Sequence, residues 1–346
     1  MLAAPRPVTR SSPARGGSGL LAPPRPSLAH PSVSRVRACF WPCRIDGART
    51  DGFNFASASW TQDTRAAPAL LNMCPRYPHI NLDLARRLEQ AEGLANVAYV
   101  ETRRELQPDL GAAWTRVEGA LALFDGLRSP LTQTFGLGVV EPPSATGLAR
   151  LEAFFARCGS STAHEVSALA APETWQLLSA WGYSPIETSV VLVRATLPAL
   201  AIASARVTAR QASELEIPTY SRVMLKGLSS EPPELVAAVE TLVPVMAHSQ
   251  GVHCFLAELD GQPIGAGLLV IQNGVALLGG ASTIPTARKQ GAQAALLRAR
   301  LAHAATLSAE LAMLVAAPGS ASQRNAERQG FRPAYTRSKW QLAPTR

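Results

Sequence analysis

The stretch Ser282-Thr-Ile-Pro-Thr-Ala-Arg-Lys-Gln-Gly-Ala-Gln-Ala-Ala-Leu-Leu297 decides the fold of this chain. It predicts a strand that ends in a loop and feeds directly into an alanine-rich helix. Gly291 lets the backbone turn tightly, and the first amide N–H groups of a helix have no partner inside it. Arg288 and Lys289 add positive charge beside these N–H groups. The stretch therefore predicts an anion site that suits a pyrophosphate.

A three-strand meander is expected immediately before this loop. Alternating and continuous apolar runs predict strands over 252–259, 264–271 and 275–282. The turns between them are Asp260-Gly261 and Asn273-Gly274, dipeptides that type I′ hairpins prefer.

A buried strand and a capped helix are expected after the loop and its helix. The unbroken apolar run 311–316 predicts the strand. The sequence Ser320-Ala-Ser-Gln323 is a capping box that opens a helix, and Gly330 closes it. A last strand is expected through 335–342.

The order Thr283-x-Pro285-x-x-Arg288-x-x-Gly291-x-Gln293 after such a meander resembles the acetyl-coenzyme A loop of the GNAT N-acetyltransferase superfamily. The resemblance implies transfer of an acetyl group from acetyl-CoA to a primary amine, by direct attack of the amine on the thioester. It implies that the backbone of Ser282, Thr283 and Ile284 pairs with the pantetheine arm and helps to polarise the acetyl carbonyl. The remaining cofactor-binding positions that it implies are Arg288, Lys289, Gln290, Gly291, Ala292, Gln293, Ala294, Asn325 and Arg328.

The chain departs from the family pattern at two positions. The last small residue of the loop, usually Gly or Ala, is Gln293, and the position of the family's usual tyrosine acid is Ala326. Tyr335 on the last strand is a candidate substitute for the acid, and Glu258 on a meander strand is a candidate general base. Both side chains have an ordinary alternative role, as a packed strand aromatic and a solvent-facing carboxylate. Without a proton donor, the chain could instead be a non-catalytic acyl-CoA-binding module that regulates a partner.

In residues 78–197 the sequence predicts a similar succession of helices and strands, including a strand over 131–140. Trp175-Gln-Leu-Leu-Ser-Ala-Trp-Gly-Tyr183-x-Pro185 occupies the place that Gln323–Pro333 fills in the second half. We therefore expect an α/β (mixed α+β) chain of two tandem GNAT-like domains, 78–197 and 201–346. Each is expected to be a mixed, mostly antiparallel twisted sheet flanked by helices.

The first of these domains is expected to lack a cofactor loop. Where the loop belongs, Val140-Glu-Pro-Pro-Ser144 brings a negative charge and two prolines without N–H donors. His164 and Glu165 in this half are candidates to line a shared substrate cleft.

The charge of the chain is concentrated in its first 72 residues, which hold nine Arg and three Asp. They are rich in Pro, Arg, Ser and Gly and have no sustained period, so residues 1–75 are expected to be a disordered basic extension. This segment could be a transit peptide, a basic arm for an acidic partner, or translated upstream sequence with the natural start at Met73. We favour the Met73 start.

The composition of the rest of the chain narrows the possible partners. Because residues 73–346 carry a net charge of only +2, a basic nucleic-acid-binding face is not indicated. No run of about 18 apolar residues indicates a membrane span. The five cysteines show no paired ligand spacing, which argues against a metal site and for a reducing, cytoplasmic location. The expected partner is a small-molecule or peptide amine, whose identity the sequence leaves open, as it does the oligomeric state.

Overall fold

A continuous 11-stranded sheet runs through the protein in a computed structural model that describes residues 77–196 and 206–342. The expected basic extension, residues 1–75, lies outside the described residues. In the first half the elements are α1 (Leu82–Leu106), a short 3-10 turn (Pro108–Leu110), β1 (Ala113–Val117), β2 (Ala120–Phe124), β3 (Gln133–Phe135), α2 (Ala145–Arg157), β4 (Ala163–Ser167), α3 (Pro172–Ala180) and β5 (Tyr183–Ala195).

The second half follows the expected order closely. Its elements are β6 (Val207–Gln211), a 3-10 turn (Glu214–Glu216), α4 (Ile217–Gly227), α5 (Pro233–His248), β7 (Val252–Leu259), β8 (Gln262–Gln272), β9 (Val275–Thr283), a 3-10 turn (Pro285–Ala287), α6 (Ala292–Thr306), β10 (Leu311–Ala316), α7 (Ala321–Arg328) and β11 (Arg332–Leu342).

The hairpin turns of the meander form where the sequence predicts them. Asp260 and Gly261 have φ angles of 51° and 77°, and Asn273 and Gly274 have 50° and 71°. Positive φ at both central residues is the requirement of a type I′ turn, which matches the twist of the flanking strands.

The expected strand over 131–140 is wrong beyond residues 133–135. Gly136 and Gly138 adopt φ angles of 74° and 75°, which strand backbone does not. Leu137 and Val139 are nevertheless almost fully buried, because the loop itself lies against the core. The apolar run over 131–140 therefore indicated that these residues are buried, but it did not indicate that they form a strand.

The strands of the two halves interleave in one sheet, with the order β1-β2-β3-β4-β11-β5-β10-β9-β8-β7-β6. β11, the last strand of the second half, lies between β4 and β5 of the first half. β5 in turn pairs with β10 of the second half. Each half thus supplies a strand that completes the sheet of the other.

The internal similarity seen in the sequence recurs in the structure. α3 leads through Gly182 into β5, and α7 leads through Gly330 into β11; both glycines have a φ angle of 84°. These two corresponding strands pair antiparallel with each other along most of their length.

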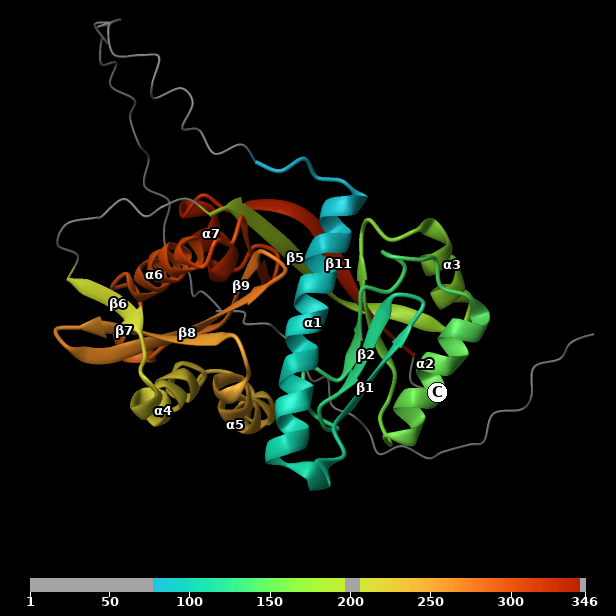
Figure 1. The fold of residues 1–346 in the computed structure, drawn as a ribbon, viewed down its shortest axis with the longest axis horizontal. Helices are drawn as coiled ribbons and strands as arrows, with labels where there is room; N and C mark the ends of the chain where they lie inside the picture. The colour runs from blue at the N-terminus through green and yellow to red at the C-terminus, as the bar shows by residue number, and fades with distance from the viewer. Residues whose placement is uncertain (1–76, 197–205, 343–346) are drawn as a thin grey trace, which may run out of the picture. The chain divides into compact units, whose positions relative to one another are not determined.

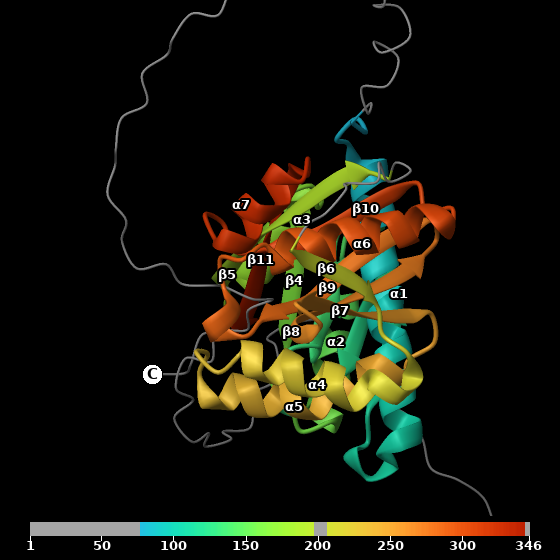
Figure 2. The same ribbon diagram turned by 90° about the vertical axis from the view of Figure 1, so that its left-hand side faces the viewer.

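Helices cover the sheet on both faces. α4 and α5 lie on one side of the β7–β9 meander and α6 lies on the other (Figure 1, Figure 2). α1 begins at Asn81, whose side chain accepts a hydrogen bond from the Leu84 amide, and it packs against strands of both halves. None of the described helices has the length and apolar character needed to cross a membrane.

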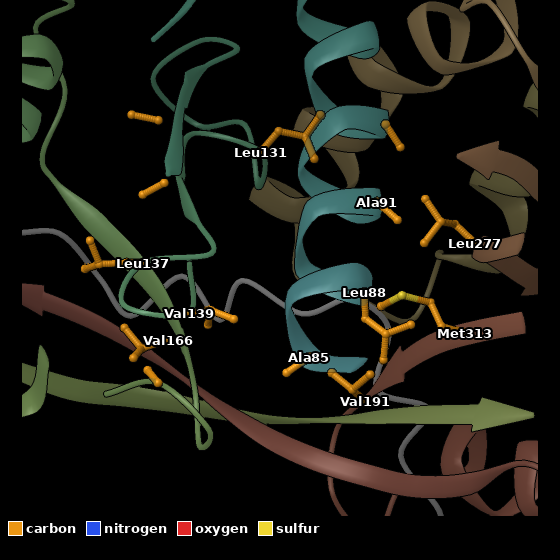
Figure 3. Close-up of a cluster of buried hydrophobic side chains, with 14 of the residues drawn as sticks. Ala85, Leu88, Ala91, Leu131, Leu137, Val139, Val166, Val191, Leu277 and Met313 are labelled. Atoms are coloured by element: carbon orange, nitrogen blue, oxygen red, sulfur yellow. The ribbon is translucent and has the colours of Figure 1, made fainter. Parts of the chain in front are cut away.

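The largest hydrophobic core is built around α1 (Figure 3). Ala85, Leu88 and Ala91 on one stripe of this helix are fully buried. They share the core with Leu277 and Met313 of the second half and with Leu137, Val139, Val166 and Val191 of the first. The two halves therefore have a common core as well as a common sheet.

Candidate functional site

The predicted anion loop joins the end of β9 to the start of α6. Lys289 and Gly291 both have positive φ angles, 65° and 95°, on either side of Gln290. Such reversals turn successive N–H groups toward the same side of the chain and form an anion-binding concavity. Lys289, Gln290 and Gly291 are exposed, so this concavity opens to solvent.

Six consecutive amides in this loop have no partner among the protein groups that the structure describes. Among the described residues, none of the backbone N–H groups of residues 289–294 donates a hydrogen bond to a protein acceptor. The first bonded amide is that of Ala295, whose N–H donates to the Gly291 carbonyl at 3.0 Å. No side chain caps the helix at Gly291. The start of α6 therefore offers a set of hydrogen-bond donors at the positive end of a helix dipole.

Two side chains fix the loop to its surroundings. The Arg288 guanidinium donates to the Gly227 carbonyl at the end of α4, at 3.1 Å. The Gln293 side chain folds back, and its Nε2 donates to the Thr283 hydroxyl at 3.0 Å. The long side chain that departs from the family pattern thus binds the last residue of β9.

β9 and β10 separate beside this loop. Their parallel pairing covers only Val275–Leu277 with Leu311–Met313, although β9 continues to Thr283 and β10 to Ala316. The Ile284 amide donates to Ile264 at 2.9 Å on the β8 side. Because ladder bonds alternate along an antiparallel strand, Thr283 directs its N–H and C=O toward the side of β10. Those groups face the opening between the two strands.

Ser282 and Ile284 contribute differently from Thr283. The Ser282 hydroxyl is buried and donates to the Met224 carbonyl of α4 at 2.9 Å. The amide of Ile284 is already used in the bond to β8. Of the three strand positions, Thr283 is the one with backbone groups directed at the opening.

The corresponding helix start in the first half is blocked. The Glu118 carboxylate accepts hydrogen bonds from the Ser144 amide and hydroxyl, at 2.7 and 2.6 Å, immediately before α2. A Cβ added at Gly147 would lie 2.1 Å from this carboxylate, so the space over the helix end is full. A fixed negative charge there opposes an anion; that this half lacks a cofactor loop stays a prediction.

Asn325 and Arg328 lie on α7, the helix that the capping box opens. The Ser320 hydroxyl accepts from the Gln323 amide at 3.2 Å, and the Arg328 guanidinium donates to Asn325 Oδ1. Ala326, which stands where the family has tyrosine, is fully buried. α7 contacts α6, but no described interaction joins either predicted side chain to the loop.

Tyr335 lies within a buried ionic network and not at the loop. Its hydroxyl donates to Glu89 Oε1 of α1 at 2.8 Å, and Arg337 donates to the same oxygen at 2.7 Å. Burial raises the pKa of Glu89 to about 7, against the opposing charge of Arg337. Burial also raises the pKa of Tyr335 well above its usual value, so this hydroxyl is a poor proton donor at neutral pH.

Glu258 is the other predicted catalytic residue, and it is held in an ion pair. It lies on β7, with β8 between it and β9. Its carboxylate accepts from Arg210 at 2.6 Å, and Arg210 also pairs with Glu216. The roles of Glu258 and Tyr335 in proton transfer stay predictions.

Arg300 is a buried residue beside the strands of this site that the sequence reasoning missed. It is 1% exposed on α6 and donates to the carbonyls of Leu268 and Gly279, at 2.9 and 3.1 Å. Leu268 and Gly279 are register partners next to a register shift between β8 and β9, and the guanidinium packs on Gly267. Burial lowers the pKa of Arg300 to about 10. An arginine on an otherwise apolar helix stripe was the available sequence signal.

A polar pocket lies where strands of both halves meet, and its residues were also missed, apart from Glu165. It is lined by Gln133, Glu165, Glu187, Ser189, Val315 and Lys339, among others. His164 does not join it, because adjacent strand residues face opposite sides of a sheet. The His164 ring is fully buried against Tyr183 instead. Polar residues two positions apart on one strand, such as Glu187 and Ser189, were the sequence signal.

No cluster of three or more His, Cys, Asp or Glu side chains that would hold a metal ion occurs within residues 77–196 and 206–342. The geometry therefore offers two features for function, an anion loop beside separated strands and a polar pocket at the junction of the halves.

Comparison with known proteins identifies the second half. Residues 218–331 match the model of the acetyltransferase (GNAT) family, a range that includes the whole loop from β9 to α6. No protein with a curated description matches the chain in sequence.

Solved structures share the fold at low sequence identity. A GCN5-related N-acetyltransferase from Kribbella flavida is 17% identical with a TM-score of 0.52, over 72% of this chain and 96% of that one. A functionally unknown conserved protein from Staphylococcus epidermidis ATCC 12228 is 10% identical with a TM-score of 0.50, over 68% and 96%. A tandem GNAT protein from the clavulanic acid biosynthesis pathway is 14% identical with a TM-score of 0.43, over 58% and 70%.

Proposed function

Because residues 218–331 form a GNAT acetyltransferase domain, we propose that the protein transfers an acetyl group from acetyl-CoA to a primary amine. The acceptor is a small molecule or a peptide. The two described cysteines, Cys158 and Cys254, are free thiols, which suits a reducing compartment such as the cytoplasm.

One observation carries this proposal: the amides of residues 289–294, at the start of α6, have no partner within the described part of the chain. Exposed N–H groups at a helix start bind phosphate oxygens through hydrogen bonds and the helix dipole. Lys289 adds a positive charge on the same exposed turn. The pyrophosphate of CoA would occupy this concavity.

The opening between β9 and β10 suits the pantetheine arm and the thioester. Pantetheine amides can extend a sheet edge, and Thr283 offers one N–H and one C=O on that side. The amine nitrogen attacks the thioester carbonyl, a C–N bond forms and the C–S bond breaks. The proton that the nitrogen loses balances the charge of the leaving CoA thiolate. Backbone donors such as the Thr283 N–H would stabilise the oxyanion formed on the way.

A glycine variant with a matched control tests the cofactor site. Gly291 and Gly182 have positive φ angles of 95° and 84°, and a Cβ added at either would meet no atom within 4 Å. Replacing either by alanine therefore adds only backbone strain, about 1–2 kcal/mol. We expect Gly291→Ala to weaken CoA binding about tenfold or more, because the strained backbone would turn the loop amides away from the phosphates. Gly182→Ala should leave CoA binding unchanged. Isothermal titration calorimetry of CoA into the full chain gives the measurement.

Equal CoA affinity in the two variants, or no CoA binding by the wild-type chain, would contradict the proposal. Thiol release from acetyl-CoA across a panel of amines then tests turnover. The buried Ala326 at the usual tyrosine position favours one second candidate, a non-catalytic acyl-CoA-binding regulator. CoA binding without thiol release on any amine would support that candidate.

A further inference from the structure

Three charged residues lie in a row along the polar pocket at the junction of the halves. Lys339 on β11 pairs in register with Glu165 on β4 and with Glu187 on β5. All three line one pocket, whose cavity volume of about 20 Å³ has room for a single group of the size of a water molecule or an ammonium group. The row therefore crosses three neighbouring strands on a single face of the sheet.

Glu165 is held rigidly in this pocket. The residue is 9% exposed, and its carboxylate accepts from Gln133 Nε2 at 3.0 Å and from the Ser189 hydroxyl at 3.2 Å. Gln133 is 2% exposed, and among the described residues its Oε1 has no hydrogen-bond partner. A buried acceptor without a donor is unfavourable, so an N–H group entering beside Gln133 would be stabilised.

The charges around the pocket favour a cation. Two carboxylates, Glu165 and Glu187, face one ammonium group, Lys339. The buried network behind them holds Glu89 and Glu92 around Arg337. Because burial raises the pKa of both of these carboxyl groups, the excess of negative charge comes from Glu165 and Glu187. Glu165 interacts electrostatically with all three groups of the buried network.

One strand that lines the pocket, β10, also borders the opening at which the thioester would lie. Val315, which lines the pocket, belongs to the part of β10 that no longer pairs with β9. β5 and β11 lie between β10 and the strand that carries Glu165. Three strand spacings, about 14 Å, therefore separate β4, which carries Glu165, from β10.

We propose that this pocket binds the distal cationic group of an elongated acceptor, a diamine or polyamine whose other amine is acetylated at the opening between β9 and β10. Glu165 and the Gln133 carbonyl oxygen receive the N–H groups of the distal ammonium. The pocket positions the acceptor and takes no part in the bond changes. This inference rests on the proposed acetyltransferase function.

Three amines of equal length test the charge preference: α,ω-diaminooctane, n-octylamine and ω-aminooctanoic acid. The assay uses the full chain and saturating acetyl-CoA. We expect kcat/KM to be about tenfold higher for the diamine than for octylamine. The difference between the diamine and the amino acid should be larger still. Diaminobutane is too short to reach both ends and should be no better than octylamine. Calorimetric titration of the diamine into the protein–CoA complex gives a readout independent of turnover.

The variant Glu165→Gln tests the residue. It should reduce the diamine preference to near that of octylamine and leave CoA affinity unchanged. The exposed Glu173→Gln on α3 makes the same charge change outside the pocket and should alter neither quantity. If Glu165→Gln lowers the melting temperature too far for assay, Ser189→Ala removes one of the two bonds that hold the carboxylate.

The outcomes separate this inference from the proposed function. Absence of CoA binding overturns the acetyltransferase proposal and this inference with it. CoA binding with equal use of diamine and octylamine overturns the pocket assignment alone. A preference for ω-aminooctanoic acid would assign the distal contact to Lys339 and overturn the cation assignment.

Discussion

Most of the charged side chains that this fold buries are paired. Arg103 forms a bidentate pair with Asp125, at 2.9 and 3.0 Å, and Arg337 is surrounded by carboxylates of α1. Such pairs are costly to break, since one partner leaves an uncompensated charge in the interior. His164 is different. Its ring is fully buried and, among the described residues, neither of its nitrogens has a hydrogen-bond partner.

His164 should make the protein sensitive to acid. Burial lowers the pKa of His164 to about 3, so the folded state keeps the ring neutral while the unfolded chain protonates below its usual value of 6.5. The stability that His164 contributes is therefore present above pH 6.5 and lost as the pH falls toward 3. At pH 5 the loss amounts to about 2 kcal/mol. We expect His164→Phe to remove this loss.

Urea unfolding at pH 7.5 and at pH 5 provides the measurement. The difference in unfolding free energy between the two pH values should shrink in His164→Phe. The exposed His79→Gln serves as the control and should retain the wild-type difference. An unchanged difference in His164→Phe would show that another group governs the acid response.

At the scale of elements, the loop between β9 and α6 is tied at both ends while its amides stay free. Arg288 binds it to the end of α4, and Gln293 binds the helix start to the end of β9. Arg300, two turns farther along α6, binds the carbonyls at the register shift of β8 and β9. Helix and strand are therefore held in one relative position before any ligand arrives, which lowers the entropy cost of binding.

The bond between Gln293 and Thr283 is expected to stabilise the fold without contacting the cofactor. Gln293→Ala and Thr283→Val should each cost about 0.5–1.5 kcal/mol of unfolding free energy, and the double variant less than their sum. CoA affinity should be kept or improved in Gln293→Ala, because the small side chain clears the space around the amides. Urea unfolding and calorimetry with CoA measure the two effects. A tenfold loss of CoA affinity would mean that the amide side chain touches the ligand.

At the scale of the whole molecule, the two halves are joined by exchanged strands. β11 has β4 and β5 as its neighbours, both from the first half. β10 pairs along one edge with β5, also from the first half. Arg103 of α1 also donates to the Thr241 carbonyl of α5 at 2.8 Å, and α1 lies in a core shared by both halves. The second half contains the family motif but not the partners of its own last strand.

The halves should therefore fold together and not alone. A protease site inserted between Thr196 and Arg206 allows the two halves to be separated after purification. Alternatively, each half can be expressed by itself. We expect each fragment alone to show no cooperative thermal unfolding, because its unpaired strand edges and open core face water. The mixed fragments should regain the circular dichroism melting curve and the CoA binding of the intact chain. Cooperative unfolding of the second fragment alone, with CoA binding, would contradict this expectation.

Local sequence signals were sufficient for the loop and the meander. The positive φ angles at Asp260-Gly261, Asn273-Gly274 and Gly291 follow from residue type, since glycine and asparagine tolerate that region at low cost. The free amides likewise follow from a strand that runs through a tight loop into a helix. These features depend on neighbours within a few residues, so the sequence alone determined them.

The sheet order and the polar pocket depended on the tertiary structure. β11 could pair with β10 or with β4. The choice is decided by contacts between residues more than 150 positions apart, such as Lys339 with Glu165. The same holds for Tyr335, whose partner Glu89 lies on α1. Strand pairing uses backbone groups that every residue carries, and so the chain encodes its partners only through the packing of the complete core.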